Sequence, residues 1–133
     1  MKISFRIKKN AEFVFDYLTD MQKFSAVHPV ITRIEPSGNE NYLVHETLKF
    51  ATIPFSFSYP VVIEKSSVDK KIIMRATVFK RTKIEMQFVL KADKENTLIE
   101  EEVQFKSPLP LNFVMKYIFK KQHQKLFKNI ELA

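Results

Sequence analysis

The sequence predicts an α+β domain in which a curved sheet of seven antiparallel strands wraps around one long C-terminal helix. The opening segment alternates apolar and polar residues, which is the period of a half-buried strand. The same period returns at Val30 and continues for about eighty residues, in runs separated by turn-forming clusters. A stretch of about twenty residues without a helix breaker then follows Pro110.

Two short helices are predicted between the first strand and the second. Asn10 is a favourable N-cap, and Glu12 complements the positive first turn of the helix that follows it. Asp20 can cap the second helix. That helix must end near His28, because Pro29 disfavours helical geometry in the residue before it.

Six further strands fit the alternating region. Their expected spans are Val30–Pro36, Tyr42–Ala51, Phe55–Lys65, Lys71–Phe79, Lys83–Lys91 and Thr97–Lys106. The connections have lengths typical of hairpins, so consecutive strands should pair antiparallel. Pro60 should mark an edge or a bulge, because proline cannot donate to a strand ladder. The apolar face of this sheet needs a cover, and the terminal helix is the element long enough to supply it.

Composition limits the classes of protein that fit. The 133 residues have the size of one domain, so we expect residues 1–133 to fold around a single core. The absence of cysteine excludes disulfides, thiolate nucleophiles and cysteine-ligated metals. No apolar run could span a membrane and the start lacks a signal-peptide pattern, which predicts a cytoplasmic location. The net charge of +7 is spread along the chain, which is typical of a solvated basic surface.

The order of elements resembles the SRPBCC superfamily, whose members share the helix-grip fold. Among the START lipid-transfer domains, the birch-pollen-allergen-like proteins and the polyketide cyclase/dehydrase-like group, the last is the most similar. The segments that carry the resemblance are AEFVFDYLTD, HPVITRIE, NYLVHETLKF, TLIEEEVQF and SPLPLNFVMKYIFKKQHQKLF. They are patterns of apolar positions and contain no catalytic signature. The resemblance implies a hydrophobic cavity for a lipid-like or polyketide-like molecule, in carriers, sensors and a minority of enzymes.

The more apolar register of each strand gives this interior its predicted lining. The side chains expected to converge on a pocket are Phe57, Tyr59, Met74, Met86 and Phe88 from the sheet and Tyr117 from the helix. Methionine adapts to irregular shapes and aromatic rings supply area with few rotatable bonds, which suits a binding site. The alternative is a filled core, in which the same side chains leave no void.

Two glutamates, Glu46 and Glu101, fall on inward registers of their strands. A buried glutamate must be paired, hydrogen-bonded or neutralised by a raised pKa, so each is a candidate polar contact for a ligand. A slip of one residue in register would instead turn either side chain to solvent. Arg75 lies on the opposite register and is expected to be exposed.

The three histidines do not have the spacing of a metal site. His28 follows a helix where the mouth of the cavity is expected and is the histidine most suited to contact a ligand. His45 should face outward, and His123 lies among lysines on the last helix and is expected at the surface. The sequence also lacks a nucleophile elbow, a dinucleotide fingerprint and a P-loop, so no catalytic residue, metal or cofactor is predicted.

The leading hypothesis is a binding or carrier protein for a small hydrophobic molecule. The enzyme-class alternative is a cyclase-like or dehydratase-like activity on a polyketide-type substrate, with Glu46 or Glu101 moving a proton. A third hypothesis is a basic surface that docks on an anionic membrane or on nucleic acid through lysines of the last helix. Specific nucleic-acid binding is disfavoured, because the predicted fold hides the sheet aromatics that single-strand binders expose. The oligomeric state is left open.

Overall fold

The computed structural model describes residues 1–108, 110 and 112–133, without the side chain of Phe50. These residues contain one seven-stranded sheet and three helices. The elements are β1 (Lys2–Ile7), α1 (Ala11–Thr19), α2 (Met21–Val27), β2 (Ile31–Gly38), β3 (Asn41–Phe50), β4 (Ile53–Ser66), β5 (Lys71–Val78), β6 (Thr82–Asp93), β7 (Asn96–Lys106) and α3 (Asn112–Glu131). The predicted fold class is confirmed.

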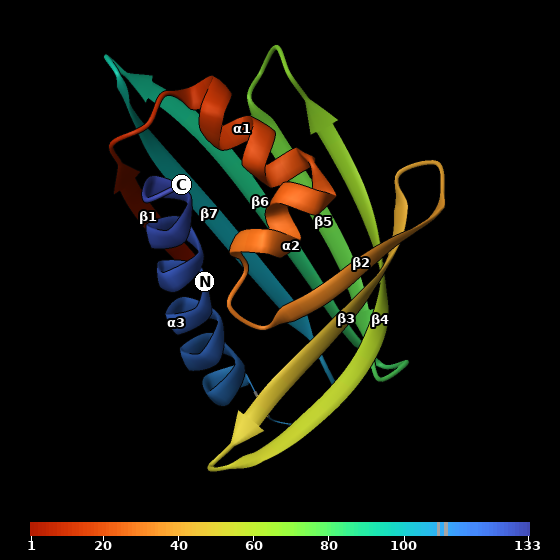
Figure 1. The fold of residues 1–133 in the computed structure, drawn as a ribbon. Helices are drawn as coiled ribbons and strands as arrows, with labels where there is room; N and C mark the ends of the chain where they lie inside the picture. The colour runs from red at the N-terminus through yellow and green to blue at the C-terminus, as the bar shows by residue number, and fades with distance from the viewer. Residues whose placement is uncertain (109, 111) are drawn as a thin grey trace.

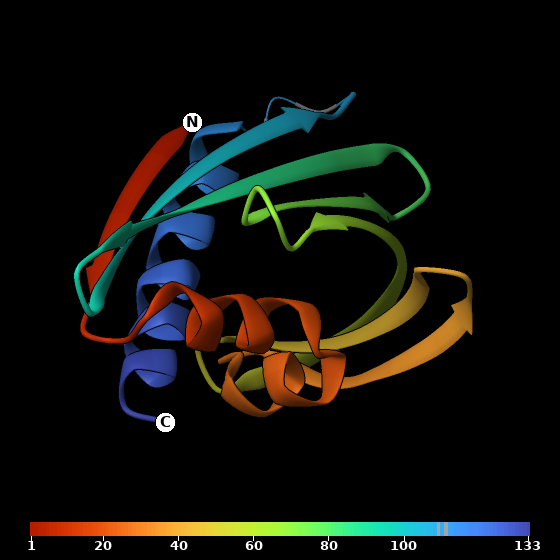
Figure 2. The same cartoon turned by 90° about the horizontal axis from the view of Figure 1, so that it is seen from above.

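The sheet is antiparallel throughout, in the order β1-β7-β6-β5-β4-β3-β2. It curls so strongly that its two edge strands approach the helices, with α3 beside β1 and α2 beside β2 (Figures 1 and 2). The helices therefore close the open side of the curl, and an interior lies between the sheet and α3.

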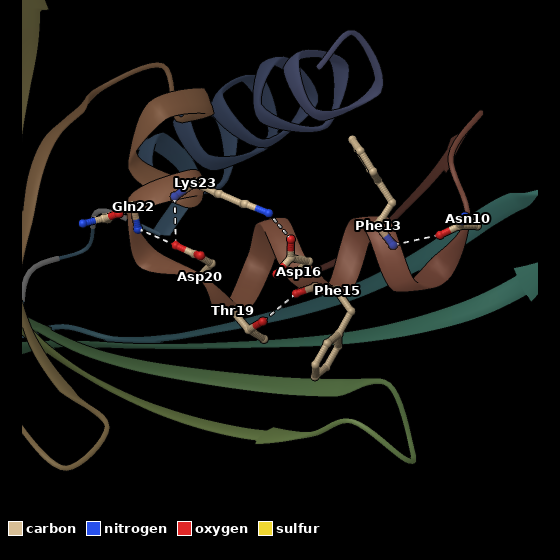
Figure 3. Close-up of polar contacts among 8 residues, drawn as sticks. All are labelled: Asn10, Phe13, Phe15, Asp16, Thr19, Asp20, Gln22 and Lys23. Atoms are coloured by element: carbon tan, nitrogen blue, oxygen red, sulfur yellow. Dashed lines mark hydrogen bonds and ion pairs between the residues drawn. The ribbon is translucent and has the colours of Figure 1, made fainter.

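Side-chain caps hold α1 and α2 in a compact hairpin across this open side (Figure 3). Asn10 accepts a hydrogen bond from the backbone N–H of Phe13 at 2.8 Å. Asp20 accepts from two backbone N–H groups at the start of α2, at 3.0 and 3.2 Å. An ion pair between Asp16 and Lys23 joins the two helices. Both caps were predicted from the sequence, and each satisfies N–H groups that a helix leaves unpaired at its start.

Strand β4 leaves its neighbour β5 at Pro60. It pairs with β3 from Ile53 to Val62, but with β5 only from Val61 to Ser66. Proline lacks an N–H, so Pro60 fits a position whose β5 side is unpaired. The sequence predicted an edge or a bulge here, and the structure has an edge. The first half of β4 and its partner on β3 form an arm that curves away from β5 (Figure 1).

The packed core lies between the sheet and the C-terminal half of α3, where Leu126, Phe127 and Ile130 are fully buried. At the edge of this core, the buried His123 of α3 contacts the buried Glu101 of β7. The imidazole Nδ1 lies 2.7 Å from Oε1 and 2.6 Å from Oε2 of the carboxyl group. This contact is an anchor between the helix and the sheet.

The expectation that His123 lies at the surface is wrong. It is four residues from both Phe119 and Phe127, which places it on the apolar face of the helix, since residues four apart share a face. The lysines around it occupy the other faces. The carboxyl group of Glu101 pairs with the buried imidazole Nδ1 of His123. Buried polar groups need such a hydrogen-bond partner.

We predict that His123→Ala lowers the free energy of unfolding by about 3 kcal/mol or more, because it leaves a buried carboxyl group without its partner. Replacing both residues with leucine should recover much of that loss. His45→Ala is the matched control, since His45 hydrogen-bonds Ser58 on the outer face of the sheet. Urea denaturation at pH 7 measures the free energy of unfolding of each variant and checks their order of stability. Equal losses for His123→Ala and His45→Ala would contradict the role of the anchor.

Candidate functional site

A cavity of about 290 Å³, here called the larger chamber, lies between the arm of β3 and β4, the adjoining strands and the N-terminal half of α3. Most of its wall is apolar, and its lining side chains are Leu48, Phe57, Tyr59, Ala76, Val78, Phe79, Ile84, Met86, Val114, Met115, Ile118 and Phe119, with Glu46, Thr82 and Gln122 as the polar members. This volume is at the lower end of the range of about 300–1,000 Å³ for small-molecule pockets.

A second, smaller chamber of about 50 Å³ lies under α2. The two chambers share the side chains Glu46, Tyr59, Met86, Phe119 and Gln122, which we call the junction. Three of these five carry polar atoms, whereas the larger chamber is apolar along most of its length. A molecule filling the larger chamber would therefore meet most of its hydrogen-bonding groups at the junction, with the Thr82 hydroxyl as the polar group elsewhere in the wall.

Glu46 and Tyr59 form the polar core of the junction. The Tyr59 hydroxyl hydrogen-bonds the Glu46 carboxyl group from the neighbouring strand. Burial raises the pKa of Glu46 to about 7, although this hydrogen bond and the nearby His123 favour the charged form. Burial and the adjacent carboxyl group also raise the pKa of Tyr59 well above its ordinary value. Tyr59 is thus a neutral donor, while Glu46 changes charge near neutral pH.

His28 lines the smaller chamber under α2. Its Nδ1 accepts hydrogen bonds from the backbone N–H groups of Val30 and Ile31, both at 3.2 Å. Burial lowers the pKa of His28 to about 3, and the nearby His123 lowers it further. The ring is neutral and carries its proton on Nε2, which leaves one donor in this chamber. The sequence placed His28 at the mouth of the cavity; the structure places it in the wall of the smaller chamber, and its contact with a ligand stays a prediction.

The other predicted lining residues are divided between cavity and core. Phe57 and Met86 line the larger chamber, and Met74 lines the smaller. Phe88 is fully buried in the core, with its ring centroid 6.1 Å from those of His123 and Phe127. Glu101 also lies in the core, behind His123, which itself lines the smaller chamber. The contact of these residues with a ligand stays a prediction.

Tyr117 does not converge on the cavity, and that expectation is wrong. Its side chain is 62% exposed and lies under the Lys121 ammonium, which is 5.5 Å from the ring centroid. The helix residues that do line the cavity are Val114, Met115, Ile118, Phe119, Gln122 and His123. They follow one helical stripe that excludes position 117, so the spacing contained the signal that sequence reasoning missed.

The described part of the chain lacks two other kinds of feature. Its histidine, aspartate and glutamate side chains form no group of three that could hold a metal ion. Among the helices of these residues, none has the length and apolarity needed to cross a membrane.

No protein-family model and no curated protein matches the sequence. Solved structures do match in fold. Ara h 8.0201 superposes with a TM-score of 0.76 at 16% identity, over 98% of this chain and 93% of its own. A START superfamily protein from Mycobacterium smegmatis gives 0.74 at 16% identity, over 98% and 93%. The Zhui aromatase/cyclase from Streptomyces sp. R1128 gives 0.68 at 10% identity, over 98% and 90%. This chain thus has the helix-grip fold of these proteins, and the resemblance to the SRPBCC superfamily is confirmed at the level of the fold.

Proposed function

We propose that the protein binds and carries a small, largely apolar molecule that has one neutral polar group at its end. The observation that supports this most strongly is the position of the junction, with Glu46, Tyr59 and Gln122 at one end of an apolar chamber. Removing apolar surface from water drives binding by about 25 cal/mol per Å², and a few polar contacts then fix orientation. The apolar body would fill the larger chamber while its polar end reaches the junction.

The size of the cavity restricts the ligand. A chamber of about 290 Å³ with a further 50 Å³ beyond it suits a compact molecule rather than a two-chain phospholipid. The chemistry of the junction restricts the polar end. Glu46 and Tyr59 can accept from and donate to a hydroxyl or carbonyl group, whereas a ligand carboxylate would meet an ionised Glu46 as pH rises above 7. We therefore expect a neutral alcohol, phenol or ketone.

Proton transfer within the cavity is the second candidate function. A carboxyl group with a pKa near 7 is matched to general acid or base work at neutral pH, and Glu46 has this property beside a neutral phenol. The aromatase/cyclase among the proteins of similar fold makes a cyclase-like or dehydratase-like reaction on a polyketide-type substrate the natural form of this candidate. Recovery of the bound molecule unchanged after prolonged incubation would favour the carrier over the enzyme.

We predict that a neutral apolar fluorophore such as N-phenyl-1-naphthylamine binds the protein and is displaced by a medium-chain alcohol. Ala76→Phe should weaken binding of the fluorophore at least tenfold. Ala76 is buried in the wall of the larger chamber, and a phenyl group at this position would fill the chamber. Ala92→Phe places the same group at an exposed position of β6 and should leave binding unchanged. Absence of fluorophore binding, or equal binding by both variants, would argue for a closed core and against the carrier.

We also predict that the Glu46 carboxyl carbon titrates with a midpoint near 7 when followed by carbon-13 NMR. Tyr59→Phe should raise this midpoint by removing a hydrogen bond to the charged form, whereas Tyr117→Phe, at an exposed position, should not. Because the folded protein binds the Glu46 proton more tightly than the unfolded chain does, the contribution of Glu46 to the free energy of unfolding falls as pH rises from about 4.5 to about 7. Glu46→Gln should remove this dependence. A midpoint near 4.5 would refute the burial of this group.

A further inference from the structure

Large apolar side chains are exposed together at one end of the molecule. They come from the start of β4, the β5–β6 turn and the start of α3, which lie at the same end of the molecule (Figure 1). We call this set the apolar rim, and its members are Ile53, Phe55, Phe79, Phe113 and Val114. Phe113 is 86% exposed and Ile53 is 70% exposed. Exposed apolar clusters of this kind mark interaction sites more often than single exposed residues do.

The apolar rim borders the larger chamber. Phe79 and Val114 are exposed and also line the chamber, so the cavity opens at this end. The Phe79 ring centroid lies 5.1 Å from that of Phe57 and 6.1 Å from that of Phe55, which connects the cavity wall to the rim. The backbone of Phe79 has a φ of 52°, in the left-handed region that bulky residues rarely adopt. Its neighbour Lys80 has a φ of 66°, and two consecutive residues in this region are typical of the tight turn that joins β5 to β6.

The positive charge of the protein is concentrated around this rim. At this end of the molecule lie residues 47–56, 76–84 and, among the described residues that follow β7, 105–108, 110 and 112–121. They contain no aspartate or glutamate and eight basic residues: Lys49, Lys80, Arg81, Lys83, Lys106, Lys116, Lys120 and Lys121. The rest of the chain has the remaining 14 basic residues and all 15 acidic ones. The excess of basic over acidic residues that gives the chain its net charge of +7 is therefore located at the rim end. The sequence had suggested an even spread, because these three segments are distant along the chain.

The eight basic side chains are exposed. Within the described part of the chain, none of them forms an ion pair, whereas basic residues elsewhere pair with neighbours, as Arg75 does with Glu64 and Glu85. Their field is thus directed outward around the apolar rim and attracts an anionic surface.

We propose that the rim end docks on the surface of an anionic lipid bilayer. The apolar rim would enter the boundary between head groups and acyl chains, and the surrounding lysines and arginine would contact lipid phosphates. A second copy of this chain fits poorly, because a two-fold contact would bring two sets of eight positive charges together. The rim phenylalanines can also stack on nucleic-acid bases, but the aliphatic side chains of Ile53 and Val114 beside them suit acyl chains better than bases.

The proposed docking on a bilayer is separate from the proposed binding of a ligand in the cavity and does not depend on it. When both hold, the cavity opens toward the bilayer, so an apolar molecule passes between membrane and protein without crossing water. The two proposals fail separately. Ala76→Phe should weaken fluorophore binding at least tenfold and keep docking, whereas the rim variant should lose docking and keep fluorophore binding.

Co-sedimentation with vesicles tests the docking. We expect the protein to bind vesicles of 70% phosphatidylcholine and 30% phosphatidylserine at least tenfold more tightly than vesicles of phosphatidylcholine alone, at 100 mM salt. The double variant Ile53→Ser with Phe113→Ser should weaken binding to the anionic vesicles at least tenfold. The matched control is Val68→Ser with Leu132→Ser, because these residues are 90% and 72% exposed away from the rim. All four substitutions are at exposed positions, and circular dichroism confirms that each variant is folded.

Three results would overturn the docking surface. The first is no binding to anionic vesicles by the unaltered protein. The second is an equal loss in the rim variant and the control variant, which would show that any exposed apolar residue has the same effect. The third is tighter binding to single-stranded RNA than to the vesicles, unaffected by the rim substitutions, which would assign the basic end to nucleic acid.

Discussion

The buried contact between Glu101 and His123 fixes α3 against the sheet at the level where packed core gives way to cavity. Toward the C-terminus of the helix, Phe127 and its neighbours fill the space completely. Toward the N-terminus, Met115 and Phe119 face a void instead. Separating a buried hydrogen-bonded pair is costly, so the helix cannot slide or tilt into the cavity to fill it. The cavity depends on this anchor.

The cavity also depends on the shape of the sheet. Pro60 is the residue at which β4 separates from β5. Strand β4 follows β3 alone before this residue and gains β5 as its second neighbour after it. The arm that results supplies Glu46 and Tyr59 to the junction, and the start of β4 supplies part of the apolar rim. One departure in strand pairing thus produces the chamber, its polar end and its opening. The proposals for the ligand and for the bilayer are two consequences of this shape.

Periodicity was sufficient to predict the strands, the caps and the long helix, because alternation and capping chemistry are local properties. It could not separate core from cavity. Phe88 and Met86 share an inward register on β6, yet one lies in the core and the other lines both chambers, because the level at which α3 is anchored decides between them. Tyr117 and His123 were misplaced because lysines surround both positions and obscure the apolar stripe of the helix. The concentration of charge at the rim was also invisible until the fold brought its segments together.

The most direct test of the account is the response of the methionine methyl groups to an apolar ligand. Four of the five methionines, Met21, Met74, Met86 and Met115, line the chambers, and Met1 does not. In a protein labelled with carbon-13 at these methyl groups, titration with a medium-chain alcohol should shift the four cavity signals and leave that of Met1 unchanged. Saturable shifts confined to the four would establish an internal ligand. Uniform shifts of all five, or none at saturating alcohol, would contradict a binding cavity.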